Sequence, residues 1–233
     1  MGNFALLQAL AFEPRKAFAE LDARPRYWWP LLVLVFAQAG VVLWYLNFVD
    51  LEWLVDLQIR ASAAGRNMTD AEVARTAQMA SANPGAQKVF GTLLSGLAVA
   101  FFMLLGALYY ALAGKITGIE RGLRHWMALS AWSSMPALLG LVAACIMMAT
   151  AGSNQIGQEA LQPLSLNALF FHREAGEPGY ALFSSANLFQ VAALALAAIG
   201  VRVWARRSWP FSIVFVSLPY VLAYGIWAFF ALR

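Results

Sequence analysis

Five long apolar stretches, each free of Asp, Glu, Lys, Arg and His, dominate the pattern of hydrophobic and polar positions along the chain. A bilayer core about 30 Å thick is crossed by about 20 apolar residues of α-helix. The stretch over residues 186–201 is shorter than that, and it reaches the required length only when it extends to Trp204, with Arg202 reaching the interface. The pattern predicts transmembrane helices over residues 28–48, 89–113, 126–149, 183–204 and 208–232.

The fold class predicted by this pattern is all-α: a polytopic integral membrane protein with five transmembrane helices and a short N-terminal interfacial helix. Residues 1–233 are expected to form a single membrane domain. Composition agrees, because 61% of the residues are hydrophobic and only 12% are charged, whereas about 25% of a soluble domain is charged. The net charge of +4 is therefore interpreted through membrane orientation and not as a nucleic-acid signal.

Residues 4–24 are predicted to form a helix on the membrane surface. Pro14 suits the first turn of a helix, where a missing N–H is not needed. Phe18 and Leu21 fall on one side of this helix, and basic residues are available to face lipid phosphates. Pro25 ends the element, and an aromatic cluster beginning at Tyr27 is typical of the headgroup level.

Local signals predict where several helices begin, bend or end. Residues 50–64 contain no Pro or Gly, so the first transmembrane helix is expected to project beyond the bilayer, with Gly65 as a natural C-cap. The spacing of Thr69 and Glu72 is that of a capping box and predicts a short polar helix. Pro136 removes a backbone hydrogen bond and is expected to kink the third span.

Two further segments are distinguished by composition. Residues 161–171 are too short to span a bilayer and too apolar for a free loop, so we interpret them as a re-entrant or interfacial segment. Residues 191–200, in the fourth span, are rich in alanine and suited to close packing against neighbouring helices.

The placing of Lys and Arg predicts the orientation. With the N-terminus inside, 10 of the 16 basic residues fall in cytoplasmic segments, as the positive-inside rule requires. We therefore expect a multi-pass protein of the cell inner (cytoplasmic) membrane with the N-terminus cytoplasmic and the C-terminus outside. Seven of the basic residues are candidate contacts for lipids or partner proteins: Arg15, Lys16, Lys115, Arg121, Arg124, Arg206 and Arg207.

Chemistry that would indicate an enzyme is missing from the pattern. The five apolar stretches offer no buried ionisable group of the kind that marks proton relays and intramembrane catalysis. A serine nucleophile in the third span would need an activating base, and none lies at that depth. We therefore expect no enzyme activity, no catalytic residue, no cofactor and no metal. A candidate polar groove or kink is formed by Ser130, Ser133, Ser134, Pro136, Tyr220 and Tyr224.

Three loose motifs spread over the chain resemble a known family. The first is Pro14-x-x-x-Phe18 followed by Pro25 and Pro30, the second is Leu108-Tyr109-Tyr110 running into Lys115-Ile116-Thr117-Gly118, and the third is Ala131-Trp132-Ser133-Ser134-Met135-Pro136. With these motifs the chain resembles the Ypt/Rab-interacting protein (YIP) family, in its bacterial branch of small five-span membrane proteins.

The resemblance implies a five-helix fold with a cytoplasmic N-terminus, in agreement with the distribution of basic residues. Eukaryotic members are linked to Rab GTPases and vesicle traffic. This sequence departs from them because its first predicted span begins at Trp28, without their long N-terminal region, so GTPase docking is not expected. The resemblance implies no particular biochemical activity.

The leading hypothesis from the sequence is a non-enzymatic integral membrane protein that organises partner proteins or lipids in the bacterial inner membrane. Its expected partners are membrane lipids, with anionic headgroups on the cytoplasmic side, and a second copy of the chain or another membrane protein; nucleic acid is not expected. The alternative is a transporter, scramblase or channel for a lipid-like or neutral solute, which would use the polar groove.

Overall fold

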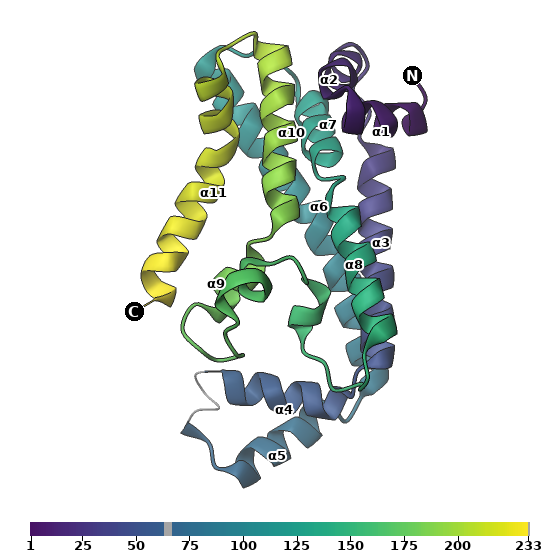
Figure 1. Ribbon diagram of the computed structural model, residues 1–233, viewed down its shortest axis with the longest axis vertical. Coiled ribbons are helices and arrows are strands. Elements are labelled where there is room, and N and C mark those ends of the chain that lie inside the picture. The colour runs from purple at the N-terminus through teal and green to yellow at the C-terminus, as the bar shows by residue number, and fades with distance from the viewer. Residues whose placement is uncertain (63–66, 233) are drawn as a thin grey trace. The chain divides into compact units, whose positions relative to one another are not determined.

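The computed structural model describes residues 1–62 and 67–232, except for the side chain of Ala160, and within those ranges it is helical with no β-strand. Figure 1 shows the elements in chain order. They are α1 (Asn3–Phe12), α2 (Pro14–Ala23), α3 (Trp28–Phe48), α4 (Leu51–Ala61), α5 (Asp70–Ala80), α6 (Pro84–Thr117), α7 (Leu123–Ser133), α8 (Ala137–Thr150), the 3-10 turn η2 (Gln158–Leu161), the π-helical turn η3 (Asn167–Phe171), α9 (Tyr180–Ser185), α10 (Leu188–Ala205) and α11 (Trp209–Ala231).

Five helical segments of the described chain are long and apolar enough to cross a membrane, which confirms the predicted fold class. They are α3, α6, the segment 123–150 that joins α7 and α8, α10 and α11. At most 28% of the apolar stretch of any of these segments is buried, and in α6 the buried share is only 11%. In water such an apolar surface would cause aggregation, so these helices are surrounded by the hydrocarbon of a bilayer.

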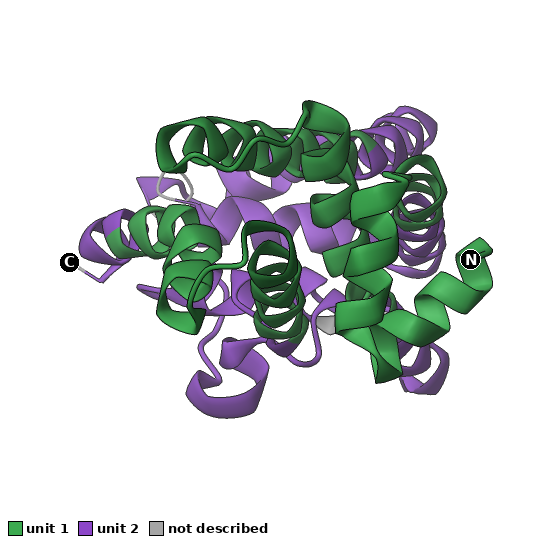
Figure 2. Cartoon of the chain, turned by 90° about the horizontal axis from the view of Figure 1, so that it is seen from above, with its two compact units in different colours: residues 1–36, 97–138, 189–225 green, residues 37–96, 139–188, 226–233 purple. Residues whose placement is uncertain are grey.

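The described chain divides into two compact units, coloured separately in Figure 2. Unit 1 comprises Met1–Phe36, Leu97–Leu138 and Phe189–Gly225, and unit 2 comprises Ala37–Gly96, Leu139–Leu188 and Ile226–Arg233. Each unit has its own cluster of buried hydrophobic residues.

In unit 1 the N-terminal segment forms two helices, α1 and α2, where the sequence predicted one. Pro14 occupies the first turn of α2, as expected, and the chain breaks at Glu13 because that residue leaves the helical conformation (φ −135°, ψ 56°). The side chains of Leu6, Phe18 and Leu21 are completely buried in the cluster of unit 1. One side of each helix therefore packs on the core of unit 1, while Phe4 and Phe12 of α1 remain strongly exposed.

The expectation that the first span projects as one continuous helix is wrong. Helix α3 ends at Phe48, and Asp50 starts the separate helix α4 by accepting a hydrogen bond from the backbone N–H of Trp53 at 3.1 Å. An aspartate side chain competes well for such free N–H groups at a helix start, and this local competition overrides the absence of Pro and Gly. Gly65, expected as the C-cap, lies outside the described residues.

The third span was expected to kink at Pro136, and the structure shows an interruption of the helix there, because α7 ends at Ser133 and α8 begins at Ala137. Proline cannot supply the N–H that the Trp132 carbonyl would receive in a continuous helix. That carbonyl instead accepts from the N–H of Met135 at 3.2 Å. The freed backbone is thus satisfied locally, as a bilayer interior requires.

In unit 2 the predicted capping box starts α5. The Thr69 hydroxyl accepts from the Glu72 N–H at 3.4 Å, and the Glu72 carboxylate accepts from the Thr69 N–H at 2.8 Å. The apolar segment 161–171 forms no membrane-spanning helix; it contains the last residue of η2 and the whole of η3, with Phe170 strongly exposed.

Candidate functional site

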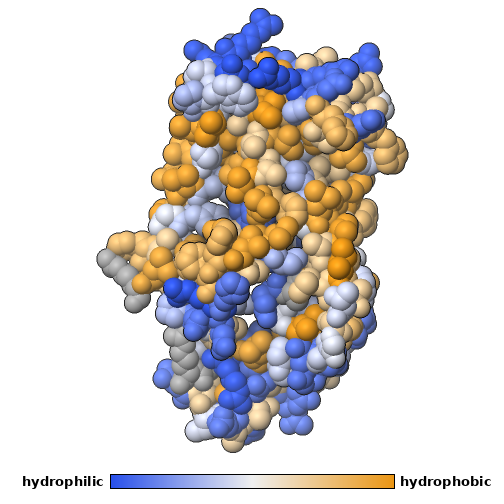
Figure 3. All heavy atoms as spheres, viewed as in Figure 1, coloured by the Kyte–Doolittle hydropathy of each residue, from blue (hydrophilic) through white to orange (hydrophobic). Residues whose placement is uncertain are grey.

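The connections between the helices of unit 1 are rich in basic residues, and all seven basic residues predicted as contacts belong to this unit. Arg15 and Lys16 are exposed on α2, Lys115 is exposed in the last turn of α6, and Arg124 is exposed in the first turn of α7. In Figure 3, which shares the view of Figure 1, hydrophilic residues cover α2 and the α10–α11 connection, while apolar side chains cover the length of α11. In this view the hydrophilic residues of unit 1 gather on α2 and at the connection between two membrane-spanning helices.

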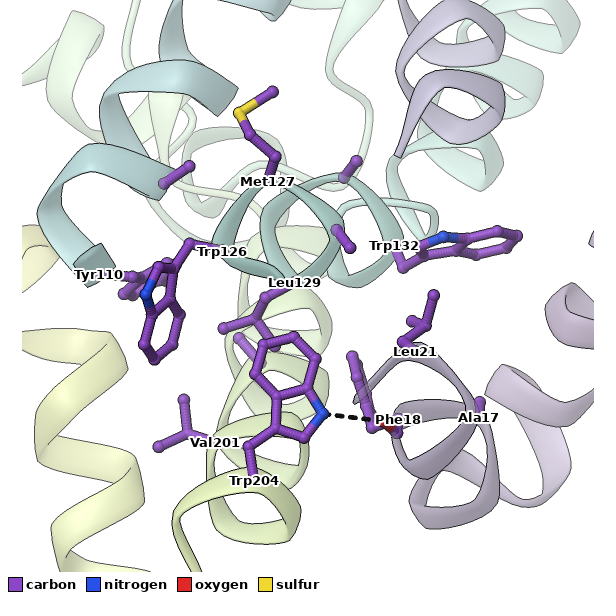
Figure 4. Packing of buried hydrophobic residues seen from close by; sticks show 14 of the residues in the cluster. Ala17, Phe18, Leu21, Tyr110, Trp126, Met127, Leu129, Trp132, Val201 and Trp204 are labelled. Carbon is purple, nitrogen blue, oxygen red and sulfur yellow. Dashed lines mark hydrogen bonds between the residues drawn. The ribbon is translucent and has the colours of Figure 1, made fainter. Parts of the chain in front are cut away.

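Buried tryptophans tie these connections together. The indole N–H of Trp204 donates to the Phe18 carbonyl at 2.7 Å, and the indole N–H of Trp126 donates to the Arg121 carbonyl at 3.0 Å. Trp132 donates in the same way to the Arg26 carbonyl at 2.6 Å. Figure 4 shows Trp204 of α10 and Phe18 of α2 with their hydrogen bond drawn between them. Each indole combines a large apolar surface with one satisfied donor, so the connections are held on a rigid base.

An ion pair fastens the α6–α7 connection to α2. Arg121 donates from Nε to Asp22 Oδ1 at 2.6 Å and from NH2 to Asp22 Oδ2 at 3.0 Å, a bidentate arrangement. These hydrogen bonds raise the pKa of Arg121 above its ordinary value. His125 adds a contact between Nε2 and the Asp22 carbonyl at 3.2 Å. Since a carbonyl only accepts, Nε2 is the protonated nitrogen of that ring.

A pocket of about 440 Å³ opens beside this ion pair. Its position is set by the end of α10, where Arg206 has a left-handed backbone (φ 51°) and donates its N–H to the Arg202 carbonyl at 3.0 Å. The walls come from the α6–α7 connection and from the last residues of α10 with those that follow it. The lining residues are Gly118, Ile119, Glu120, Arg121, Trp204, Ala205, Arg206 and Arg207.

The structure brings only part of the predicted basic set into this pocket. Arg121, Arg206 and Arg207 line it together, although at least 85 positions separate Arg121 from the other two in the chain. The remaining four candidates do not line it: Arg15, Lys16, Lys115 and Arg124.

Sequence reasoning missed three residues of this site. Trp204 was treated only as the end of a span, and the roles of Glu120 and Asp22 were not anticipated. The available signal was the presence of acidic residues among the basic residues of the segments 13–24 and 114–124. Such residues are candidates for ion pairs or for recognition of a positive group.

The residues predicted to form a polar groove do not line either pocket described here. Ser133 donates to the Leu129 carbonyl at 2.7 Å and Ser134 donates to the Ser130 carbonyl at 2.8 Å, so both hydroxyls return to their own helix. Tyr224 contacts Gln190 Oε1 at 3.3 Å. The Ser130 hydroxyl is buried without a hydrogen-bond partner among the described residues.

Unit 2 has a separate pocket of about 340 Å³ that the sequence did not predict. The hydroxyl of Tyr180 donates to Glu159 Oε2 at 2.9 Å, and burial, with the nearby charge of Glu159, raises the pKa of Tyr180 to about 12. The hydroxyl therefore stays protonated at neutral pH and acts as a donor. The lining residues are Leu54, Leu57, Gln58, Ala61, Ser62, Gln158, Glu159, Ala175, Gly176, Glu177, Tyr180 and Ala181.

Comparison with known proteins assigns a family to nearly the whole chain. The family model of the Yip1 domain matches residues 7–230. No curated protein and no solved structure matches the chain. The match agrees with the resemblance carried by the three sequence motifs.

Proposed function

The chain belongs to the Yip1 domain family, and from this premise we propose that it is a non-enzymatic membrane protein that organises lipids or partner proteins in the bacterial inner membrane. We place the N-terminus in the cytoplasm and the C-terminus outside, because the basic residues are concentrated in the connections that this orientation makes cytoplasmic. The partners we propose are anionic lipids and a further membrane protein or copy of this chain.

The observation that carries the proposal is the set of exposed basic side chains in the connections of unit 1. Each Lys or Arg near an anionic membrane surface contributes about 1 kcal/mol of attraction. In unit 1, Arg15, Lys115 and Arg124 form no ion pair with the described residues, whereas Lys16 is paired with Glu13 at 2.9 Å. In unit 2, Arg60 is paired with Asp56 and Asp70, both at 2.7 Å. An ion pair of this kind reduces the charge available to a lipid surface.

We predict that the fourfold variant Arg15→Gln, Lys16→Gln, Lys115→Gln, Arg124→Gln retains fewer anionic lipids than the unaltered protein. All four residues are exposed and lie outside the pocket of unit 1, so the fold is expected to persist. The measurement is native mass spectrometry of the full chain with phosphatidylglycerol at low and high salt. The difference should shrink at high salt, because ions screen exposed charges beyond about 10 Å at 0.1 M.

The control removes the same amount of charge from unit 2 by replacing Arg60, Arg75, Lys88 and Arg173 with Gln. Its effect on retained phosphatidylglycerol is expected to be smaller. Equal losses in the two variants, or no loss in the first, would contradict the proposed lipid contact. A bound protein partner or a defined oligomer in the same spectra would favour the protein-organising branch of the proposal.

Transport or scrambling of a lipid-like or neutral solute is the second candidate, and one observation favours it. The Ser130 hydroxyl is buried and unpaired in the described chain, about one turn before α7 ends at Ser133. A buried polar group without a partner destabilises a fold, so a passing solute would supply the missing hydrogen bond.

We predict that Ser130→Ala leaves folding intact or slightly stabilised, because it removes this unsatisfied group. The proposed organising function expects liposomes with the unaltered protein to show no flux of fluorescent lipid or neutral solute above empty controls. The transport alternative instead requires flux that decreases in Ser130→Ala. Flux that is absent from the unaltered protein would remove the alternative.

A further inference from the structure

The pocket of unit 1 holds charges of both signs that do not neutralise one another. Neither guanidinium of Arg206 and Arg207 makes a hydrogen bond or ion pair with the described residues, although Arg207 lies over the Phe211 ring at 5.8 Å. The Glu120 carboxylate likewise forms no ion pair in the described chain, even though it lines the same pocket. Opposite charges that share a pocket without pairing favour a ligand that carries both signs.

Arg121 is a fixed wall of this pocket and not a free ligand group. Its guanidinium is held by both oxygens of Asp22, and its NH1 donates to the Glu120 carbonyl at 3.1 Å. The Asp22 carboxylate compensates its charge. The positive groups available to a ligand are therefore Arg206 and Arg207, and the negative group available is Glu120.

The backbone of Arg206 gives independent support. Its φ of 51° is a left-handed conformation, which at a helix end is normally occupied by glycine because a Cβ is strained there. Arg206 lines a charged pocket and keeps a strained backbone at a position where glycine would be more stable. Such conflicts cluster at functional sites.

We propose that this pocket binds the headgroup of a phospholipid that carries a primary ammonium group beside its phosphate. Arg206 and Arg207 bind the phosphate, for which the guanidinium fork is well suited, and Glu120 binds the ammonium. The volume of about 440 Å³ lies in the usual range for small-ligand sites. This inference rests on the proposed function and names the lipid class of one specific site.

The position of the pocket in the chain favours a membrane lipid, and not a soluble phosphate ester, as its ligand. One wall of the pocket begins at Gly118, directly after the last residue of α6, and the other wall includes Ala205, the last residue of α10. Both helices are long and apolar enough to span a membrane. Headgroups lie where spanning helices end. The exposed Ile116, at 81% relative exposure, offers an apolar surface for the acyl chains next to the pocket.

The test is native mass spectrometry of the full chain titrated with phosphatidylethanolamine or phosphatidylglycerol of matched acyl chains. At about 0.5 M salt, exposed charges are largely screened, so the first lipid bound reports the pocket. The unaltered protein should bind one phosphatidylethanolamine more tightly than phosphatidylglycerol. We expect Arg206→Gly to weaken this binding about tenfold while thermal stability is kept or raised, since glycine relieves the left-handed backbone.

Glu120→Gln should reduce the preference for phosphatidylethanolamine about threefold, the scale of an exposed ion pair, and should leave phosphatidylglycerol binding unchanged or stronger. The matched control is Arg124→Gln, which removes one positive charge outside the pocket and should leave the first site unchanged. Soluble glycerophosphoethanolamine is the third probe. If this soluble compound binds as tightly as the lipid, the ligand of the pocket is a free phosphate ester and the lipid assignment is overturned.

The outcomes separate this inference from the function on which it rests. Binding of phosphatidylethanolamine that Arg206→Gly and Glu120→Gln leave unaltered would overturn the pocket assignment, whatever the fourfold basic variant shows. Loss of phosphatidylglycerol in the fourfold variant, with phosphatidylethanolamine binding unaltered in the pocket variants, would support the proposed surface contact and reject the pocket. Loss of phosphatidylethanolamine in the pocket variants, with phosphatidylglycerol binding unaltered in the fourfold variant, would support the pocket and reject the surface contact.

Discussion

Replacing Trp204 by alanine is expected to lower the free energy of unfolding by about 3 kcal/mol or more, the usual loss when a large aromatic residue is removed from a core. Trp204 is only 5% exposed and lies edge-on to Phe18, with ring centroids 6.3 Å apart. It also packs against Trp126 at 5.8 Å. Its removal leaves a cavity between α2, α7 and α10 and deprives the Phe18 carbonyl of a donor.

The measurement is a denaturation series of the full chain in mild detergent with increasing SDS, followed by circular dichroism. Trp204→Phe separates the two contributions, because it keeps most of the ring packing and loses only the indole donor, for a cost of about 1 kcal/mol. Trp209→Ala is the matched control, since Trp209 is 37% exposed and contacts the Arg202 guanidinium at 4.7 Å. Similar losses for Trp204→Ala and Trp209→Ala would contradict a structural role for the buried indole.

The position of Trp204 illustrates what the sequence does and does not predict in this protein. The five spans follow from length and absence of charge, because an ionisable group in hydrocarbon is costly. The same pattern cannot separate the side of a helix that packs on protein from the side that faces lipid, since both are apolar. An interfacial position and a buried position are therefore equally compatible with a tryptophan at the end of a span.

Features of the backbone that depend only on neighbouring residues were predicted correctly. The capping box at Thr69 and the break at Pro136 depend on neighbouring backbone groups, and both were predicted. The end of α3 was not predicted, because no proline or glycine marks it. The side chain of Asp50 caps the start of α4 instead and accepts a hydrogen bond from a backbone N–H there. The pocket of unit 1 was not predicted, although Arg121, Arg206 and Arg207, which line it, were named from the sequence as candidate lipid or partner contacts. Its shape depends on the pairing of Asp22 with Arg121, 99 residues apart, which no pattern in one sequence reveals.

Gly200 is the position where the close packing expected of the alanine-rich fourth span is most demanding. A Cβ built at Gly200 would overlap Leu129 Cδ1 and would lie 2.9 Å from Phe18 Cδ1. Real Cβ atoms are essentially never found that close to another atom, so the Leu129 and Phe18 side chains would have to shift, although both are completely buried. Ala197 and Ala198, on the preceding turn, are also almost completely buried. Small side chains are what allow helices to approach in this way.

We therefore expect Gly200→Val to lower the free energy of unfolding by about 2 kcal/mol, as overpacked cores usually do, in the same SDS series. The matched control is Gly225→Val, because a Cβ at Gly225 meets nothing within 4 Å and exposed substitutions usually change stability by less than about 0.5 kcal/mol. Because the clash at Gly200 involves Phe18, the double variant Gly200→Val, Phe18→Ala should lose less than the sum of its two single losses. Strict additivity would contradict a close contact between Phe18 of α2 and the backbone of α10 at this glycine.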